Sequence, residues 1–214
     1  MRVDVRLLAI LDPEVLGGRD PLGAARAAQA GGATAMQLRM KRSGAGAMLA
    51  LARALRQELT VPFYLNDRAD VAWAAGADGV HLGADDLPAE AVRAVTSGPF
   101  RIGVSVGTPL EARAAGRAAP DYWSIGSVYA TPTKPDAGSP IGIPGFRALA
   151  ALAPDGMPVI GIGGITADNA GELVRAGARG VAVISAIFAA PDIEGAARRL
   201  RDAVDAALAS LDAG

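Results

Sequence analysis

The chain has 214 residues, of which 51% are hydrophobic and only 4% aromatic, and its 21 Lys and Arg residues balance 22 Asp and Glu residues. A near-neutral charge argues against a nucleic-acid-binding protein, which usually carries a basic excess. The absence of cysteine excludes disulfides, thiolate catalysis and cysteine-bound zinc. The first ten residues are typical of a strand rather than a signal peptide, and no apolar run approaches the roughly 18 residues of a transmembrane helix. We therefore expect a cytoplasmic protein with no membrane or nucleic-acid partner; a homo-oligomer is compatible with the sequence, which does not decide the point.

Apolar runs alternate with alanine-rich helical patterns along the whole chain. The predicted strands cover 6–11, 34–40, 62–66, 78–82, 101–106, 122–128, 158–162 and 180–185. The predicted helices cover 20–30, 43–59, 67–75, a segment from 88, 109–118, a segment from 145, 167–176 and 193–211. The strands are continuous apolar runs, as expected where both faces of a parallel sheet are buried. Eight such units predict an α/β fold, a single-domain (β/α)₈ barrel over 1–214, with a doubly wound sheet as the alternative.

In a (β/α)₈ barrel the active site lies at the carboxyl ends of the strands, in the loops that follow them. This rule places the polar and glycine-rich strand ends of the chain on one rim. The rim residues are Gln37, Arg39, Lys41, Asn66, Asp67, Asp85, Asp86, Ser105, Thr131, Thr133, Lys134, Gly163, Gly164, Thr166, Ile184 and Ser185.

Asp67 and Asp86 follow adjacent predicted strands, which lie roughly 5 Å apart in a sheet. Two carboxylates at that distance can share a cation, and oxygen ligands without His or Cys suit Mg²⁺ held jointly with substrate phosphates. Asp67 also opens a predicted helix, and Asp85 or Asp86 precedes the next one, where Asp is a common N-cap. Spacing alone does not choose between a metal site and helix capping.

Arg39, Lys41 and Lys134 are positioned to neutralise a diphosphate, with Arg as a fork and Lys as a point charge. Arg39 shares one face of its strand with Gln37 and Lys41, because side chains alternate along a strand. Three polar residues on the buried end of a strand need partners, which favours a ligand over a solvated rim.

Two further features concern the second half of the rim. The stretch Gly161-Ile-Gly-Gly-Ile-Thr166 precedes a helix, whose N-terminal N–H groups bind anions, and barrels of this class commonly bind phosphate after strands seven and eight. The alternative is a plain glycine turn. The long loop after 122–128 carries Thr131, Thr133 and Lys134, and we interpret it as a lid over the site. His81, the single histidine, is expected to be a packed, hydrogen-bonded residue, and Trp73 and Trp123 are expected to be packing residues.

Taken together, these stretches resemble the thiamine-phosphate synthase family over nearly the whole chain. The matching stretches are Gln37-Leu-Arg-Met-Lys41, Tyr64-Leu-Asn-Asp-Arg68, Ala75-Gly-Ala-Asp-Gly-Val-His-Leu-Gly83 with Asp85-Asp86, Ile102-Gly-Val-Ser105, Ala130-Thr-Pro-Thr-Lys134, and Ile162-Gly-Gly-Ile165 with Ile184-Ser185. The combination is highly specific, although no single stretch would be.

The resemblance implies an enzyme, a Mg²⁺-dependent transferase of thiamine biosynthesis. It would join a hydroxymethyl-pyrimidine diphosphate to a thiazole phosphate and release diphosphate. By resemblance, the pyrimidine diphosphate is held by Gln37, Arg39, Lys41, Asn66 and Lys134, with Ser105 near its leaving group. The thiazole phosphate is held by Thr131, Thr133, Gly164, Ile184 and Ser185, and Mg²⁺ by Asp67 and Asp86. Arg39, Ser105 and Lys134 are the expected catalytic residues.

The sequence departs from the family pattern at two places. Ala84 stands where a Gln usually precedes the acidic pair, and Gly107 stands where a His usually follows Ser105. The thiazole tautomerases, a related class, use a histidine near that second place and tend to lack the full Asn-Asp and Thr-x-Thr-Lys sets. The synthase is therefore the favoured reading, with a tautomerase-like relative and a non-catalytic barrel that binds thiamine precursors as alternatives.

Overall fold

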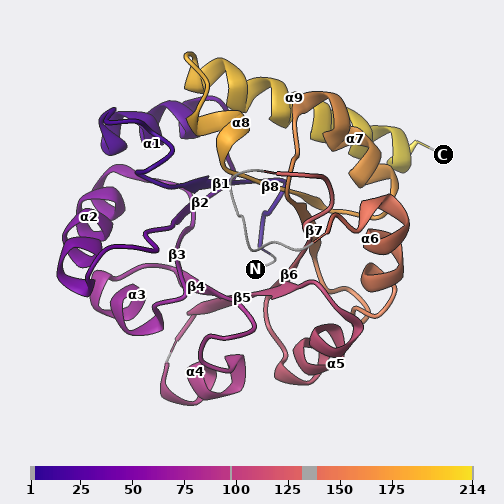
Figure 1. The fold of residues 1–214 in the computed structure, drawn as a ribbon, viewed down its shortest axis with the longest axis horizontal. Helices are drawn as coiled ribbons and strands as arrows, with labels where there is room; N and C mark the ends of the chain where they lie inside the picture. Colours follow the sequence, from indigo (N-terminus) through magenta and orange to yellow (C-terminus); the bar gives the residue numbers. More distant parts are fainter. Residues whose placement is uncertain (1–2, 97, 132–138, 214) are drawn as a thin grey trace.

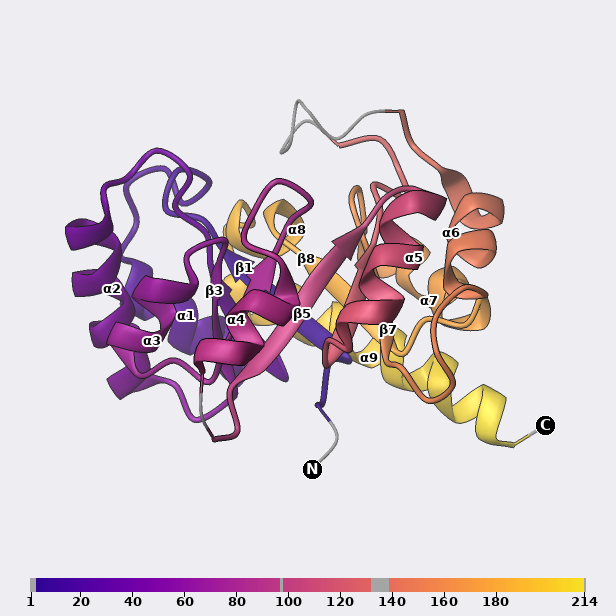
Figure 2. The same cartoon turned by 90° about the horizontal axis from the view of Figure 1, so that it is seen from below.

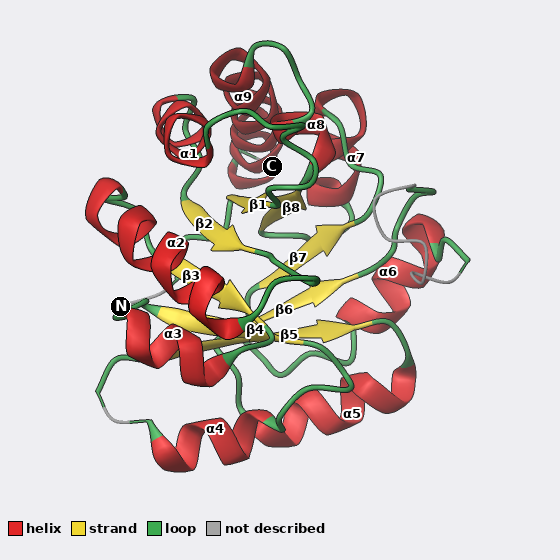
Figure 3. Ribbon diagram, turned by 60° about the vertical axis from the view of Figure 1, so that its left-hand side comes forward, coloured by secondary structure: helices red, strands yellow, loops and turns green. Residues whose placement is uncertain are grey.

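A computed structural model describes residues 3–96, 98–131 and 139–213. Within those residues, eight parallel strands close into a barrel in chain order, with β8 pairing back to β1. The view down the barrel in Figure 1 shows the helices forming a ring around the strands, and Figure 3 shows the same two layers coloured by element. The predicted (β/α)₈ barrel is confirmed, and the doubly wound alternative is wrong because the sheet has no free edge. All described elements belong to this one barrel.

The elements follow the predicted alternation closely. The strands are β1 (Leu7–Leu11), β2 (Ala35–Leu38), β3 (Phe63–Asn66), β4 (Gly79–Leu82), β5 (Arg101–Val106), β6 (Tyr122–Ile125), β7 (Val159–Ile162) and β8 (Gly180–Val183). The helices are α1 (Pro21–Ala30), α2 (Ala45–Glu58), α3 (Ala69–Ala75), α4 (Ala89–Val95), α5 (Pro109–Ala118), α6 (Gly142–Ala150), α7 (Ala167–Arg175), α8 (Ser185–Phe188) and α9 (Ile193–Asp212). None of the helices in the described ranges is both long and apolar enough to cross a membrane.

Two segments on the rim differ from the prediction. β8 ends at Val183, and the chain turns at Ile184 (φ −109°, ψ −81°) into the short helix α8. Ile184 and Ser185 therefore open a helix that the sequence pattern did not predict, and do not end a strand. β6 likewise ends at Ile125, and α6 begins three residues earlier than predicted, at Gly142 with φ +63°.

The amino ends of the strands are tied together by a repeated side-chain contact. Thr34 accepts from the Leu7 N–H at 3.0 Å, and Asp78 accepts from the Phe63 N–H at 2.8 Å. Asp121 makes the corresponding bond with β5, at 2.7 Å from the Ile102 nitrogen. In each case the residue just before a strand binds the start of the preceding strand. These contacts fix the register of the two strands at the amino end of the barrel.

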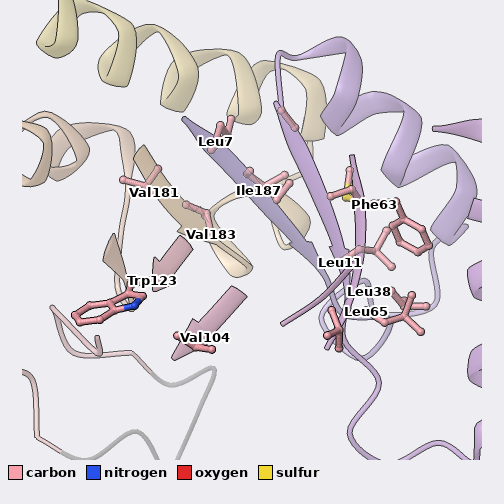
Figure 4. Packing of buried hydrophobic residues seen from close by; sticks show 14 of the residues in the cluster. Leu7, Leu11, Leu38, Phe63, Leu65, Val104, Trp123, Val181, Val183 and Ile187 are labelled. Carbon is pink, nitrogen blue, oxygen red and sulfur yellow. The ribbon is translucent and has the colours of Figure 1, made fainter. Parts of the chain in front are cut away.

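Side chains that alternate along the strands divide between two cores. The outward-facing residues pack beneath the helices, and Figure 4 shows part of this cluster, including Leu7, Phe63 and Trp123. The inward-facing cluster is smaller and contains the two fully buried rings of Tyr64 and Tyr122. These rings meet edge to face, with centroids 5.8 Å apart. They fill the interior of the barrel and do not line the cavity at its carboxyl end.

The two tryptophans differ in their surroundings. Trp123 is completely buried on the outer face of β6, as expected of a packing residue. Trp73 packs edge-on against Phe100, at 5.6 Å between ring centroids, yet 48% of its surface remains exposed. It closes the outer surface between α3 and the start of β5 rather than filling the core.

Candidate active site

A cavity of about 170 Å³ opens at the carboxyl ends of the strands. Figure 2 shows this end of the barrel opposite the N-terminus, with the segment that follows β6 on the same side. The predicted substrate and metal residues that line the cavity are Gln37, Arg39, Lys41, Asn66, Asp67, Ser105, Thr131, Gly164, Ile184 and Ser185. Asp86 lies immediately beside it, on an adjoining groove between α4 and α5. Thr133 and Lys134 lie outside the described residues.

The polar face of β2 enters the cavity as the alternation predicts. Gln37 is 1% exposed and points inward, and Arg39 and Lys41 continue the same face beyond the strand end. Arg39 Nη1 lies 2.5 Å from Asp12 Oδ2, in a pair whose side chains are 16% and 4% exposed. Lys41 Nζ lies 2.6 Å from Asp67 Oδ2 and is about half exposed. Arg39 is therefore held rigidly by a buried carboxylate, while Lys41 is bound to Asp67, a residue of the predicted metal site.

Asp67 and Asp86 do not cap helices. The N-cap residues of α3 and α4 are Arg68 and Pro88, so the capping interpretation is wrong for both carboxylates. Asp67 has a left-handed backbone (φ +65°), a conformation that costs a non-glycine residue about 1 kcal/mol or more. Its N–H is held by the carbonyl of His81 at 2.8 Å. This geometry keeps the Asp67 side chain on the rim.

The two carboxylates affect each other directly. The pKa of Asp86 is raised, first by burial and then by hydrogen bonding and charge repulsion from Asp67, against the lowering effects of the Gly83 N–H and of Lys41. The Gly83 nitrogen lies 2.7 Å from Asp86 Oδ2. Two neighbouring anions of this kind are a poor arrangement without a cation. Lys41 supplies one positive charge, and a divalent ion would supply two more.

The β7–α7 loop requires its two glycines. Gly163 and Gly164 have φ of +97° and +64°. A Cβ on Gly163 would lie 2.0 Å from Ser127 Oγ, and one on Gly164 would lie 2.5 Å from the carbonyl oxygen of Ala130. The loop therefore packs backbone to backbone against the segment after β6. Beyond a plain turn, the two glycines form part of the cavity wall.

Helices begin immediately behind this wall. Thr166 caps α7 in a reciprocal box with Asn169, whose amide also donates to the Gly164 carbonyl at 3.0 Å. The α8 turn follows β8. Arg19 donates to the carbonyl of Phe188, the last residue of α8, and, at 2.7 Å, to the carbonyl of Ala190 just beyond it. The α7 contacts thus fix the loop that carries Gly164, and the Arg19 contacts fix the chain beyond Ser185; both Gly164 and Ser185 line the cavity.

Sequence reasoning missed several residues of the site. Asp12 follows β1 on the same rim, so the rule applied to the other strands would have found it. Ser124 and Ser127 also line the cavity, but a serine in an apolar run carries little signal. His81 is buried and hydrogen-bonded as expected, with 6% exposure, and it also faces the cavity.

Comparisons with known proteins agree with this geometry. The thiamine monophosphate synthase family profile matches residues 7–187. The thiamine-phosphate synthase of Moorella thermoacetica is 48% identical over 92% of this chain and 95% of its own length, and that of Roseiflexus castenholzii is 50% identical over 90% and 85%. The solved thiamine phosphate pyrophosphorylase from Pyrococcus furiosus superposes with a TM-score of 0.86 at 37% identity, covering 97% of this chain and 98% of its own. The chain belongs to the thiamine monophosphate synthase family.

Proposed function

We propose that the chain catalyses the synthesis of thiamine phosphate from a hydroxymethyl-pyrimidine diphosphate and a thiazole phosphate. The bond between the pyrimidine methylene carbon and the diphosphate oxygen breaks, and its electron pair leaves with diphosphate. The lone pair of the thiazole nitrogen forms the new carbon–nitrogen bond. The observation that carries this proposal is that basic residues, Asp67 and a glycine-rich loop face one cavity, with Asp86 in the groove that adjoins it.

The pyrimidine diphosphate fits the β2–β3 side of the cavity. Arg39 and Lys41 provide positive charge there, and Gln37 and Asn66 provide amide groups deeper in the barrel. Asp12 binds Nη1 of the Arg39 guanidinium, which would leave the other N–H groups of that side chain for the diphosphate. The role of Lys134 in neutralising the leaving group rests on the sequence pattern.

The carboxylate pair fits a Mg²⁺ ion. Asp67 and Asp86 offer hard oxygen donors, and no third His, Cys, Asp or Glu joins them in a metal-binding group within the described ranges. A site with two carboxylates matches Mg²⁺, which usually completes its coordination with water and substrate phosphates. When bound, Mg²⁺ would neutralise charge on the diphosphate leaving group. Asp67 and Asp86 would hold it at the boundary between the barrel rim and the diphosphate.

The thiazole phosphate fits the opposite wall. Gly164, Ile184 and Ser185 bring the amino ends of α7 and α8 to the cavity, and Thr131 reaches it from the segment after β6. Backbone N–H groups at helix ends favour anions. Thr133 is assigned to the same phosphate from its sequence motif.

This arrangement supports positioning and charge neutralisation more than general base catalysis. The reaction needs an in-line nucleophile and a stabilised leaving group. Arg39, with Lys134, would stabilise the diphosphate, and Ser105 would contact the pyrimidine near the breaking bond. The small phosphorylated substrates, together with the absence of cysteine, favour a cytoplasmic enzyme.

The proposal is tested by incubating the purified chain with both substrates and Mg²⁺ and measuring thiamine phosphate. Asp67→Asn and Asp86→Asn should each abolish turnover or raise the Mg²⁺ requirement while the fold survives, as judged by circular dichroism. Retained substrate binding without product in the wild type would favour a non-catalytic binding barrel. Isomerisation of the thiazole alone, without the pyrimidine substrate, would favour a tautomerase.

A further inference from the structure

A hydrogen-bonded chain of side chains runs from the barrel interior to the cavity. The hydroxyl of Tyr122, on β6, lies 3.0 Å from Nδ1 of His81, on β4, and Nε2 of the same ring lies 3.0 Å from Ser105 Oγ, on β5. Tyr122 is completely buried and His81 nearly so, whereas Ser105 lines the cavity. The chain therefore connects the closed interior of the barrel to a residue expected to touch the substrate.

The backbone is shaped to allow this chain. Gly103 is the β5 residue paired with both His81 and Tyr122 in the sheet. A Cβ there would lie 2.1 Å from Tyr122 Cζ and 2.4 Å from its hydroxyl oxygen. With glycine at this position, the phenol ring crosses over β5 and stacks on the imidazole, with centroids 5.5 Å apart and planes inclined by 29°. The contact between Tyr122 and His81 is thus built into the strand sequence.

The surroundings of Tyr122 decide the direction of the hydrogen bonds. Burial raises the pKa of its phenol well above the usual value of 10, so the hydroxyl keeps its proton. A buried O–H needs an acceptor, and Nδ1 of His81 lies at bonding distance. The amide nitrogen of Gln37, a donor, is buried beside the phenol without reaching hydrogen-bond geometry. A donor on that side of the phenol favours the arrangement in which Tyr122 gives its hydrogen to the imidazole.

We propose that Tyr122 and His81 are positioning residues that set the polarity of Ser105. Tyr122 donates to Nδ1, which holds His81 as the neutral Nε2–H tautomer. Nε2–H then donates to Ser105 Oγ, so that the serine hydroxyl hydrogen points into the cavity. Ser105 thereby presents a hydrogen-bond donor, and its partner on the pyrimidine diphosphate is an acceptor atom, either a ring nitrogen or an oxygen of the leaving group. The substrate named here rests on the proposed function, whereas the tautomer does not.

The tautomer can be observed directly, because His81 is the single histidine in the sequence. Protein labelled with ¹⁵N-histidine gives one imidazole spectrum, whose coupling pattern identifies the protonated nitrogen. We expect Nε2–H in the ligand-free protein at neutral pH, and a mixture of tautomers in Tyr122→Phe. An Nδ1–H or doubly protonated ring in the wild type would overturn the proposal. This result does not depend on turnover, so it is separate from any failure of the synthase assignment.

A matched pair of variants tests the path to Ser105. In His81→Gln the amide nitrogen reaches the position of Nε2 and can still donate to Ser105, whereas the shorter Asn cannot. We expect kcat/KM for the pyrimidine diphosphate to fall about twofold in His81→Gln and about tenfold in His81→Asn, the effect of losing one hydrogen bond. In a Ser105→Ala background the Asn substitution should cost less than about twofold, because residues acting through a shared contact are not additive. Equal losses for Gln and Asn, or a full tenfold loss without Ser105, would show that His81 only supports packing.

Discussion

Replacing Asp12 by Asn should weaken both the fold and the binding of the pyrimidine diphosphate. The carboxylate is 4% exposed and its partner Arg39 16% exposed, so the pair is largely shielded from water. Removing one member of a buried ion pair costs about 3–5 kcal/mol. We take about 3 kcal/mol, the lower end of that range, because Arg39 keeps access to solvent through the cavity. At 2–4 °C per kcal/mol for a chain of this size, the melting temperature should fall by about 6–12 °C.

The same substitution releases the Arg39 guanidinium from its fixed orientation. We expect KM for the pyrimidine diphosphate to rise about tenfold, equivalent to about 1.4 kcal/mol, while KM for the thiazole phosphate stays unchanged. Thermal unfolding followed by circular dichroism measures the first effect, and steady-state kinetics the second.

The control for Asp12→Asn is Glu14→Gln in the same loop. Glu14 pairs with Arg42, but both side chains are exposed, at 49% and 79%. Exposed ion pairs contribute little to stability, so this variant should match the wild type in melting temperature and KM. If Asp12→Asn behaves like Glu14→Gln in both measurements, the claim that Asp12 holds Arg39 in place is refuted.

Three further predictions concern the rim. Lys41→Met should raise the affinity for Mg²⁺ by up to about fivefold, because the half-exposed lysine competes with the ion for Asp67. Calorimetry without diphosphate measures this affinity, and an unchanged or weaker value would contradict the prediction. Gly163→Ala should lower the melting temperature much more than Gly177→Ala. Both glycines have φ near +100°, but only a Cβ at position 163 would contact a neighbouring loop. Equal losses in the two variants would show that backbone strain alone causes the destabilisation. Asp86→Asn, with chelator present, should raise the melting temperature at pH 7, because the folded protein disfavours the ionised carboxylate whose pKa is raised. That gain should vanish below about pH 3.8, where the carboxyl is protonated in both folded and unfolded chains; a gain independent of pH would exclude the charge as its cause.

The barrel was predictable because its signals are local and repeated. Apolar strand runs, glycine turns and acidic residues before strands recur along the chain, and the end ties of Asp78 and Asp121 show why they do. The rule that active-site residues follow the carboxyl ends of the strands then placed the described site residues at one cavity, except Asp86, which lies in the adjoining groove. Residues 184–185 were misassigned because an apolar β-branched run continues past the point where the backbone turns into α8.

What the sequence could not supply were contacts between distant strands. The role of Asp67 was ambiguous until its backbone angle and the N-cap residues of α3 and α4 were known. The chain from Tyr122 to Ser105 depends on three strands and on the space left by Gly103, none of which a linear pattern reveals. The segment 132–138, including Thr133 and Lys134, lies outside the described residues, so its interpretation as a lid stays a prediction.

We propose above all that this protein joins two phosphorylated substrates in one cavity, with loss of diphosphate. The most direct measurement follows both products together, with each substrate present alone and then combined in Mg²⁺. We expect thiamine phosphate and diphosphate to form at equal rates, and only when both substrates and Mg²⁺ are present. Diphosphate release without the thiazole at the same rate, or no thiamine phosphate at high enzyme concentration, would contradict it.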